Sequence, residues 1–326
     1  MKKVILYGGL GAVAAVGCGI AILALKGPQA RTALEIKVAM TPERIERGRY
    51  LFETVAHCDG CHSPRDWSKY TAPVIVESRA SGVAFPAELG LPGAVVAPNL
   101  TPDRDTGLGG WTDGEKIRAI REGVDKDGRA LFPFMPYQSY AKMSNEDVES
   151  IVAFMNTLKP VRNSLPLTKL DFPVSLMIKF APQPVRDKVA APDRNDKLAY
   201  GRYLVTIGDC AGCHSPKERG KEIEGKHLAG GMEFALGGFL VRSANITPDE
   251  ETGIGRWSEE RFLARFKGNA GMTPESVPRA NQASFTLMGW MDYSKLDEAD
   301  IRAIYAHLRT LAPVHNPVET HPPVAN

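Results

Sequence analysis

The sequence contains little cysteine, few aromatic residues and no excess of charge of one sign. Its 326 residues include only five cysteines, 8% aromatic residues and a formal net charge of +2. Five cysteines are too few to staple a chain of this length with disulfides. Lys and Arg are scattered among Asp and Glu, so the chain lacks the basic blocks of nucleic-acid-binding proteins, and no nucleic-acid partner is expected. Patterns typical of β-strands are weak throughout, which favours an all-α fold.

One long run of apolar residues is present, and it lies at the N-terminus. From Val4 to Leu25 the chain has no charged residue, while Lys2 and Lys3 precede this run and Lys26 follows it. A helix over the run would be about 33 Å long, which suffices to cross a hydrocarbon core of about 30 Å. The apolar region of a cleaved signal peptide is shorter. We therefore expect an uncleaved single transmembrane helix, with its basic end in the cytoplasm and the rest of the chain exported.

Cys18 lies inside this apolar run and leaves one alternative open. Ala15-Val16-Gly17-Cys18 has the composition of a lipoprotein cleavage site, after which Cys18 would carry the lipid. The following residues up to Leu25 stay apolar where a lipoprotein normally begins a polar tether, which favours the uncleaved anchor. Both interpretations place the remainder of the chain on the outer face of a membrane.

The other four cysteines form two copies of Cys-x-x-Cys-His, each followed by Ser-Pro. The copies are Cys58-Asp-Gly-Cys61-His62 and Cys210-Ala-Gly-Cys213-His214. A structural zinc site needs four ligands, and neither copy has a second pair of cysteines or histidines at the short spacing of such sites. A thioredoxin-like redox pair would need a βαβ setting, which the sequence does not predict. Covalent haem attachment needs two thiols about one helical turn apart, followed directly by a histidine that ligates the iron. We therefore predict two covalently bound haem c groups, attached through the motif cysteines and ligated by the motif histidines.

The two motifs belong to an internal repeat. The stretch 48–51 reads Gly-Arg-Tyr-Leu before the first motif, and 201–204 reads the same before the second. Asn99-Leu-Thr-Pro-Asp103 recurs at 245–249, and Leu-x-Pro-Val closes both halves. The repeat predicts an N-terminal anchor and tether (1–40), a first domain (41–161), a proline-rich connector (162–194), a second domain (195–314) and a C-terminal tail (315–326).

Apolar residues recur at helical spacing within each half. Thr41-Pro42 is typical of a helix start, and the stretches 148–158 and 301–311 each predict an amphipathic helix. Gly48 and Gly201 lack a Cβ and would let a crossing helix approach closely. The connector is apolar from 172 to 180, and we expect it to pack along both domains.

With these features the chain resembles the membrane-anchored dihaem cytochromes c, and it is similar to the cytochrome c subunits of bacterial membrane-bound alcohol and aldehyde dehydrogenases. The resemblance is carried by the two Cys-x-x-Cys-His motifs, the two Asn-x-Thr-Pro-Asp runs and Phe134-Met135-Pro136-Tyr137. It implies an all-α protein of two tandem cytochrome c-type domains after a single N-terminal transmembrane helix. It also implies a location in the bacterial inner membrane, with both domains in the periplasm. Those relatives often carry three haem domains, whereas this chain has two.

The resemblance further implies a methionine as the second axial ligand of each iron. Met135 precedes Pro136 and lies twelve residues before Asp147, as in the family pattern. Met143 is the alternative in this half, and its place at a helix start favours a core position. Histidines outside the two motifs have no counterpart in the other half, so packing or solvated roles are expected for them. Among them is His57, whose counterpart is Asp209.

The corresponding methionine of the second half is Met288, which lies twelve residues before Asp300. Gly289 follows it where the first half has proline, which leaves this loop less rigid. Met291 and Met272 remain the alternatives in this half.

An iron with histidine and methionine ligands changes oxidation state without binding a substrate, because both axial positions are filled. The expected function is therefore transfer of single electrons, from a dehydrogenase or another donor to a respiratory acceptor such as a terminal oxidase or another cytochrome. No residue is assigned a catalytic role. The alternative is a dihaem redox enzyme, peroxidase-like or thiosulfate-oxidising, which would need an open or non-methionine position at one iron.

Overall fold

The computed structural model describes residues 27–218 and 220–323. The predicted transmembrane run Val4–Leu25 and the alternative lipid site Cys18 lie outside these residues, so both remain predictions. Within the described ranges, no helix is long and apolar enough to span a bilayer.

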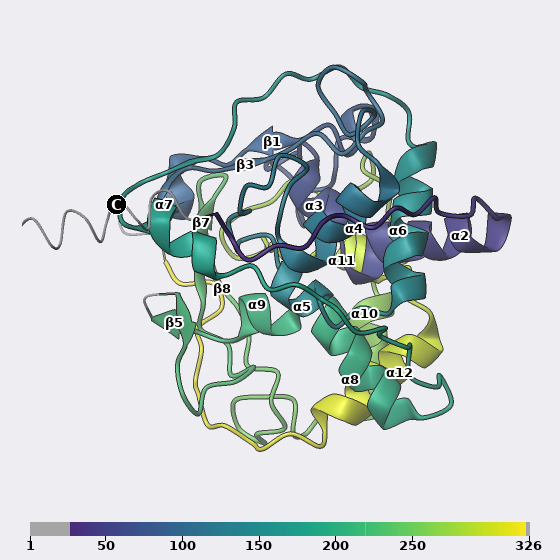
Figure 1. Ribbon diagram of the computed structural model, residues 1–326. Helices are drawn as coiled ribbons and strands as arrows, with labels where there is room; N and C mark the ends of the chain where they lie inside the picture. The colour runs from purple at the N-terminus through teal and green to yellow at the C-terminus, as the bar shows by residue number, and fades with distance from the viewer. Residues whose placement is uncertain (1–26, 219, 324–326) are drawn as a thin grey trace, which may run out of the picture.

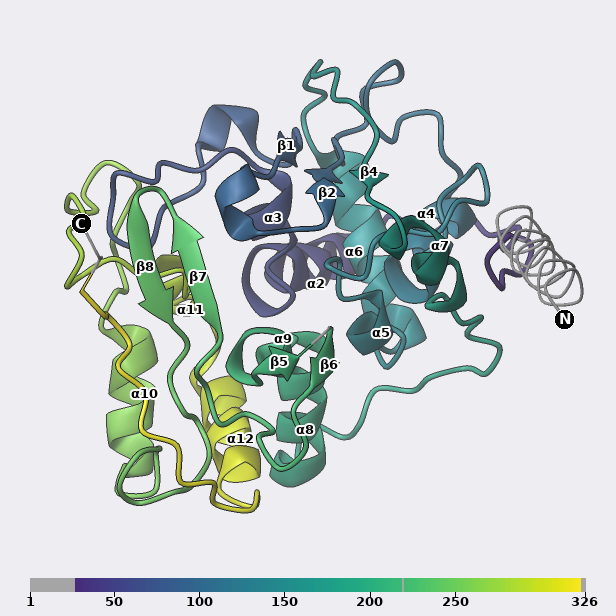
Figure 2. The ribbon, with the colours of Figure 1, turned by 90° about the vertical axis from the view of Figure 1, so that its left-hand side faces the viewer.

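The two halves contain equivalent helices in the same order. The first half has α2 (Pro42–Tyr50), its π-helical continuation η1 (Leu51–Val55), α3 (Cys58–His62), α4 (Asp113–Glu122), α5 (Tyr137–Tyr140) and α6 (Asn145–Thr157). Short 3-10 turns η2 (Val76–Ser78) and η3 (Ala87–Leu89) lie in the long loop after α3. The second half has α8 (Lys197–Ile207), α9 (Cys210–His214), α10 (Glu259–Lys267), α11 (Trp290–Tyr293) and α12 (Glu298–Leu308). In both views α2 lies beside α6, and α8 lies beside α12 (Figures 1 and 2).

Short antiparallel ribbons accompany the helices, and the all-α prediction did not include them. They pair β1 (Val83–Ala84) with β3 (Val96–Ala97), β2 (Gly93–Ala94) with β4 (Lys169–Leu170), β5 (Lys217–Glu218) with β6 (Lys221–Glu222), and β7 (Glu233–Leu236) with β8 (Phe239–Arg242). The hairpin β7–β8 turns at Gly237 and Gly238, both with positive φ, which suits a two-residue hairpin loop. The ribbons lie in loops, while the buried core is built mainly from the helices.

The first helix of the first half starts where the sequence predicts, and the first helices of both halves pack as it predicts. Thr41 caps α2 by accepting the Arg44 N–H at 3.3 Å, with proline at the first helical position. A Cβ on Gly48 would lie 1.8 Å from the carbonyl oxygen of Ser150 in α6. A Cβ on Gly201 would likewise lie 1.9 Å from the carbonyl oxygen of a residue in α12. The helices cross at a separation that only glycine permits.

The two halves share one hydrophobic core. Fully buried side chains of the first half, including Leu51, Phe52 and Val152, belong to the same cluster as Leu204 and Ile301 of the second half. A continuous core of this kind favours folding of the halves as one unit.

A symmetric pair of hydrogen bonds crosses between the halves. The Tyr50 hydroxyl donates to Asp300 Oδ2 at 2.8 Å, and the Tyr203 hydroxyl donates to Asp147 Oδ2 at 2.6 Å. Each hydroxyl also accepts a backbone N–H at the start of the partner helix, from Asp297 in one case and the equivalent serine in the other. Equivalent residues thus exchange equivalent contacts, which is the pattern of a twofold, isologous interface within a single chain.

The connector docks on the first half. Its strand β4 pairs with β2, and Asn145 exchanges two hydrogen bonds with the backbone of Val189, at 2.9 and 3.0 Å. Its short helices are α7 (Val174–Met177) and η4 (Ile178–Phe180). The expectation that its apolar middle packs along both domains is wrong for its largest side chains, since Phe172 is 70% and Met177 is 63% exposed. Figure 2 shows the chain leaving α7 and running along the outside to α8.

Candidate functional site

Each Cys-x-x-Cys-His motif forms a one-turn helix, α3 or α9. The residue before each helix, His57 or Asp209, has a left-handed backbone with φ 47°, which turns the chain sharply out of the preceding helix. The two cysteines occupy the first and fourth positions of the turn, and the histidine is its last residue. The structure thus brings each predicted cysteine pair and its histidine onto one short element.

Backbone carbonyls fix the orientation of both motif histidines. His62 Nδ1 lies 2.8 Å from the carbonyl oxygen of Pro98, and His214 Nδ1 lies 2.7 Å from that of Ala244. A carbonyl only accepts, so Nδ1 carries the proton and Nε2 keeps a free lone pair. Burial lowers the pKa of both imidazoles, and the bond to the carbonyl only partly offsets this, so the neutral form is favoured. A neutral imidazole held through Nδ1 is the usual state of a histidine that ligates a metal through Nε2.

An asparagine beside each of these carbonyls braces the loop. Asn99 follows Pro98; its side chain accepts the Thr101 N–H at 2.9 Å and donates to the Val161 carbonyl at 2.8 Å. Asn245 follows the other acceptor and makes the same two bonds, to Thr247 and to Val314, at 2.9 and 2.8 Å. The Asn-x-Thr-Pro-Asp runs therefore hold the histidine-orienting carbonyls against the Leu-x-Pro-Val end of each domain.

The motif thiols do not form a metal-binding cluster. A zinc site needs deprotonated thiolates from several ligands. Within residues 27–218 and 220–323, no three His, Cys, Asp or Glu side chains gather closely enough to hold a metal ion. The donor set of each motif fits a covalently attached haem c: two thiols and one oriented imidazole.

The structure places Met135 and Met288 in equivalent loops. The Met135 carbonyl accepts the Tyr137 N–H at 2.8 Å, and the Met288 carbonyl accepts the Trp290 N–H at 2.7 Å. The next residue has φ −81° and ψ 48° in the first loop, and φ −72° and ψ 59° in the second. These matching turns agree with the register counted from the sequence.

The alternative methionines occupy other positions. Met143 is fully buried in the core, as its helix-start position predicted. Met291 lies within α11 and is 5% exposed. Met272 follows α10 in a loop, where its N–H bonds to the carbonyl of Asn269. None of the three has the turn geometry that Met135 and Met288 share.

The model of the cytochrome c family matches residues 45–159 and 198–312, which together make up more than half of the chain. The chain belongs to the cytochrome c family. Each of its two cytochrome c domains carries one covalently attached haem c, so the chain binds two. Membership of the cytochrome c family implies a role in electron transfer.

Curated relatives of this cytochrome resemble it across most of its length. The cytochrome c subunit of a quinone alcohol dehydrogenase from Gluconacetobacter polyoxogenes is 29% identical over 293 residues, covering 85% of this chain and 58% of the relative. The cytochrome subunit of fructose dehydrogenase from Gluconobacter japonicus is 30% identical, covering 82% of this chain and 52% of the relative. A dihaem c-type cytochrome from Cereibacter sphaeroides is 29% identical, covering 84% of this chain and 88% of the relative. The chain thus spans little more than half the length of these alcohol and fructose dehydrogenase subunits.

Sequence reasoning missed the contacts that join the two haem motifs to the opposite domain. His57 Nε2 lies 3.2 Å from Asp292 Oδ2 in α11, and the Ser139 hydroxyl in α5 donates to Asp209 Oδ1 at 2.7 Å. His57 and Asp209 are equivalent, so these contacts follow the same twofold pattern as the tyrosine pair. The sequence pairs the two positions but does not indicate their partners, which lie 235 and 70 residues away.

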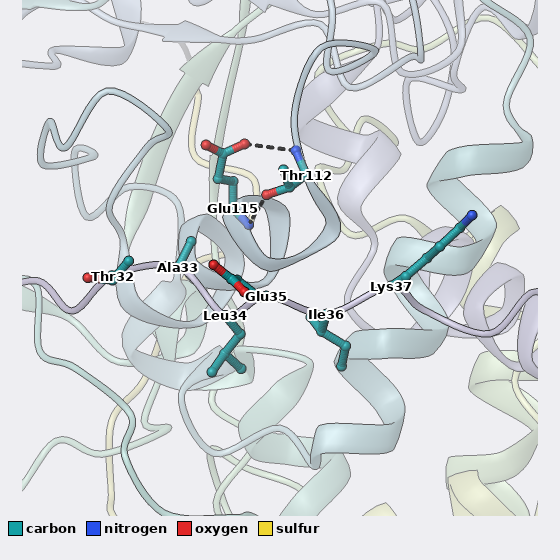
Figure 3. A pocket seen from close by; sticks show the side chains of 8 residues that line it. All are labelled: Thr32, Ala33, Leu34, Glu35, Ile36, Lys37, Thr112 and Glu115. Carbon is teal, nitrogen blue, oxygen red and sulfur yellow. Dashed lines mark hydrogen bonds between the residues drawn. The ribbon is translucent and has the colours of Figure 1, made fainter.

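A surface pocket also lies outside the two motifs (Figure 3). It is lined by the segment 32–37 and by Thr112 and Glu115 at the start of α4. The Glu115 N–H donates to Thr112 Oγ1 at 3.2 Å, and the Thr112 N–H donates to Glu115 Oε2 at 2.7 Å. These bonds are those of a helix capping box. The pocket is a feature of the helix start, and we assign it no function.

Proposed function

We propose that this protein is a membrane-anchored dihaem cytochrome c that transfers single electrons on the periplasmic face of the inner membrane. The bound haem supplies one-electron exchange between ferrous and ferric iron. Cys58 and Cys61 attach the first haem, and Cys210 and Cys213 attach the second. The observation that carries the proposal is the paired orientation of the two motif histidines, each with Nδ1 bonded to a carbonyl and Nε2 left free.

We assign the iron ligands as one histidine and one methionine in each domain. His62 and Met135 serve the first iron, and His214 and Met288 serve the second. The equivalent turns at Met135 and Met288 support this assignment. With a histidine and a methionine held to each iron, neither iron would keep a position open for a substrate, which favours a carrier over a peroxidase-like or thiosulfate-oxidising enzyme.

The donor that we propose is a dehydrogenase subunit. The relatives named above include cytochrome subunits of an alcohol and a fructose dehydrogenase, and another is a cytochrome c subunit of gluconate 2-dehydrogenase. The acceptor is a terminal oxidase or another respiratory cytochrome.

The apolar run Val4–Leu25 anchors the chain. The anchor is tested by fractionating cells that express either the full chain or a form whose residues 1–26 are replaced by a cleavable export signal. The full chain should sediment with membranes and the shortened form should be soluble. Retention of the shortened form in membranes would exclude the run as the anchor.

The ligand assignment is tested with Met135→Ala and Met288→Ala in the full-length protein. Ferric haem with a thioether ligand has a weak far-red absorption band, and each substitution should remove about half of it, because each removes one of two sulfur ligands. Each variant should also bind cyanide at one iron and show a lower reduction potential, since methionine ligation raises the potential. Pyridine-haemochrome analysis should still give two covalent haems per chain.

Met143→Ala and Met291→Ala are the matched controls, because both remove a buried methionine from outside the two turns. They should leave the band unchanged. An unmodified protein that binds cyanide readily and turns over peroxide would favour the enzyme instead of the carrier.

A further inference from the structure

The ligand loop of the second domain lacks the proline that stiffens the loop of the first. Pro136 follows Met135, and Gly289 follows Met288, although the two residues have nearly the same backbone angles. A proline ring holds φ near this value, whereas glycine explores many conformations. Some other contact must therefore hold the Met288 loop in its turn.

The His57 imidazole occupies the space that a side chain at 289 would need. A Cβ on Gly289 would lie 2.5 Å from His57 Cε1, and a Cβ on Gly60 would lie 2.8 Å from the same atom. The ring is thus inserted between two glycines, one from each domain. A proline at 289 would clash with this imidazole. The His57 ring can therefore lie here only because residue 289 is glycine.

A hydrogen bond fixes the ring to the second domain. His57 Nε2 lies 3.2 Å from Asp292 Oδ2, in the helix that begins two residues after Met288. The side chains of His57 and Asp292 are only 12% and 8% exposed. The ring also meets Tyr293 edge-on, with centroids 5.4 Å apart.

A second residue of the first domain holds the Met288 backbone directly. The Thr71 hydroxyl donates to the Met288 carbonyl at 3.0 Å, and Thr71 is 2% exposed with φ 58°. Its loop is fastened to the second domain by backbone bonds from Tyr70 to Pro278 and from Ala280 to Ser68, both of 2.9 Å. A strained, left-handed threonine kept in this place is consistent with a positioning role.

We propose that His57 and Thr71 of the first domain are positioning residues that hold the Met288 loop of the second domain in its iron-ligating turn. The inference rests on the proposed function, since it takes Met288 as a ligand. In the first domain Pro136 supplies the stiffness within its own loop. The axial ligation of the second haem therefore depends on the first domain, whereas the first haem keeps its ligand independently of this contact.

The test uses His57→Gly in the full-length haem-loaded protein, with Asp209→Gly as the matched control. Both positions have φ 47°, so glycine removes each side chain without adding backbone strain. His57→Gly should reduce the far-red band toward that of Met288→Ala and speed cyanide binding at one iron about tenfold or more. Asp209→Gly removes the equivalent cross-domain bond but leaves the Met135-Pro136 loop stiff, so it should change neither signal.

A rescue separates positioning from a general loss of structure. Gly289→Pro alone should also weaken the far-red band, because the proline ring would clash with the His57 imidazole. Combining His57→Gly with Gly289→Pro should restore the band, because the proline fills the vacated space and stiffens the loop as in the first domain. Failure of the pair to restore it would count against this explanation.

The outcomes distinguish the positioning role of His57 from the assignment of Met288 as an iron ligand. If Met288→Ala leaves the band intact, the ligand assignment fails and the inference fails with it. If Met288→Ala weakens the band while His57→Gly matches the unmodified protein, the ligand stands and the positioning role is overturned. Should His57→Gly not accumulate with two haems, Thr71→Ala and Thr71→Ser decide the question. The serine variant should keep the band and the alanine variant should lose part of it, and equal bands would overturn the proposal.

Discussion

At the scale of single residues, the chemistry of each haem site depends on an asparagine as well as on the motif. Asn99 holds the loop whose Pro98 carbonyl accepts from His62, and Asn245 does the same in the second domain. Both asparagines are nearly fully buried, at 2% and 4% exposure. The sequence does not indicate these bonds, because the Val161 and Val314 carbonyls that the asparagines contact are distant in the chain.

Asn99→Ala should therefore destabilise the fold and loosen the Pro98 carbonyl that orients His62. It leaves the Thr101 N–H without its acceptor and removes the Asn99 bond to the Val161 carbonyl, which should lower the free energy of unfolding by about 1–3 kcal/mol. A looser Pro98 carbonyl makes His62 a weaker donor to the iron, so the reduction potential of one haem should rise. Denaturant titration and a spectroelectrochemical titration measure the two effects.

The control for this substitution is Asn195→Ala, which removes an exposed asparagine and should change stability by less than about 0.5 kcal/mol. An Asn99→Ala protein that loses stability at an unchanged potential would limit the asparagine to a structural role.

At the residue scale, contacts between residues close in the sequence could be predicted, and contacts between distant residues could not. The two cysteines and the histidine of each motif are local, so their joint position on one helical turn was predictable. The place of Met288 in a turn equivalent to that of Met135 was predictable, because the repeat supplies a register; its role as an iron ligand stays a prediction. The contact of His57 with Asp292 was not predictable, because it joins residues 235 positions apart and has no sequence pattern of its own.

At the scale of elements, the helices follow from apolar spacing and from their caps. The helices that the stretches 148–158 and 301–311 predicted are α6 and α12, and their apolar residues lie in the core. The π-helical turn η1 and the short ribbons were missed, because a few residues of backbone pairing leave no detectable period. Gly48 and Gly201 were correctly interpreted as points of close helix approach.

Gly48→Ala should destabilise the first domain through this crossing. The added methyl would lie 1.8 Å from the Ser150 carbonyl oxygen, so α2 and α6 must separate. We expect a loss of about 1–3 kcal/mol or more in the free energy of unfolding, as for other overpacked sites. Gly110→Ala is the control, because the nearest atom to its Cβ is 4.0 Å away. Equal stability of the two variants in a thermal or denaturant melt would show that the crossing is not as tight as described.

At the scale of the whole molecule, the repeat folds back on itself as a twofold pair. Equivalent tyrosines donate to equivalent aspartates, and equivalent residues before the haem motifs contact equivalent short helices. The sequence predicted two similar domains but not this arrangement, because nothing in a repeat specifies which faces meet. The asymmetry at His57 and Gly289 lies within this pair, where the residue before each haem motif contacts the short helix that follows the methionine loop of the other domain.

The paired tyrosines should make the two domains unfold together. Tyr50→Phe leaves Asp300 and the Asp297 N–H without a partner, whereas Tyr203→Phe leaves only the equivalent Ser144 N–H without one, because Asp147 keeps its ion pair with Arg47. Each substitution should cost about 1–3 kcal/mol of stability, because it strands buried polar groups.

The measurement for this prediction is denaturant unfolding followed by both far-ultraviolet circular dichroism and the haem Soret band. In the unmodified protein and in either single variant, the two probes should give one coincident transition, because the core is shared. In the double variant the contact between domains is weakened from both sides, so the transition should broaden or separate into two. Tyr70→Phe serves as the control, since only its backbone N–H, and not its hydroxyl, enters a described hydrogen bond with the other domain. Two separate transitions in the unmodified protein would mean that the domains fold independently, and the symmetric interface would then contribute little to stability.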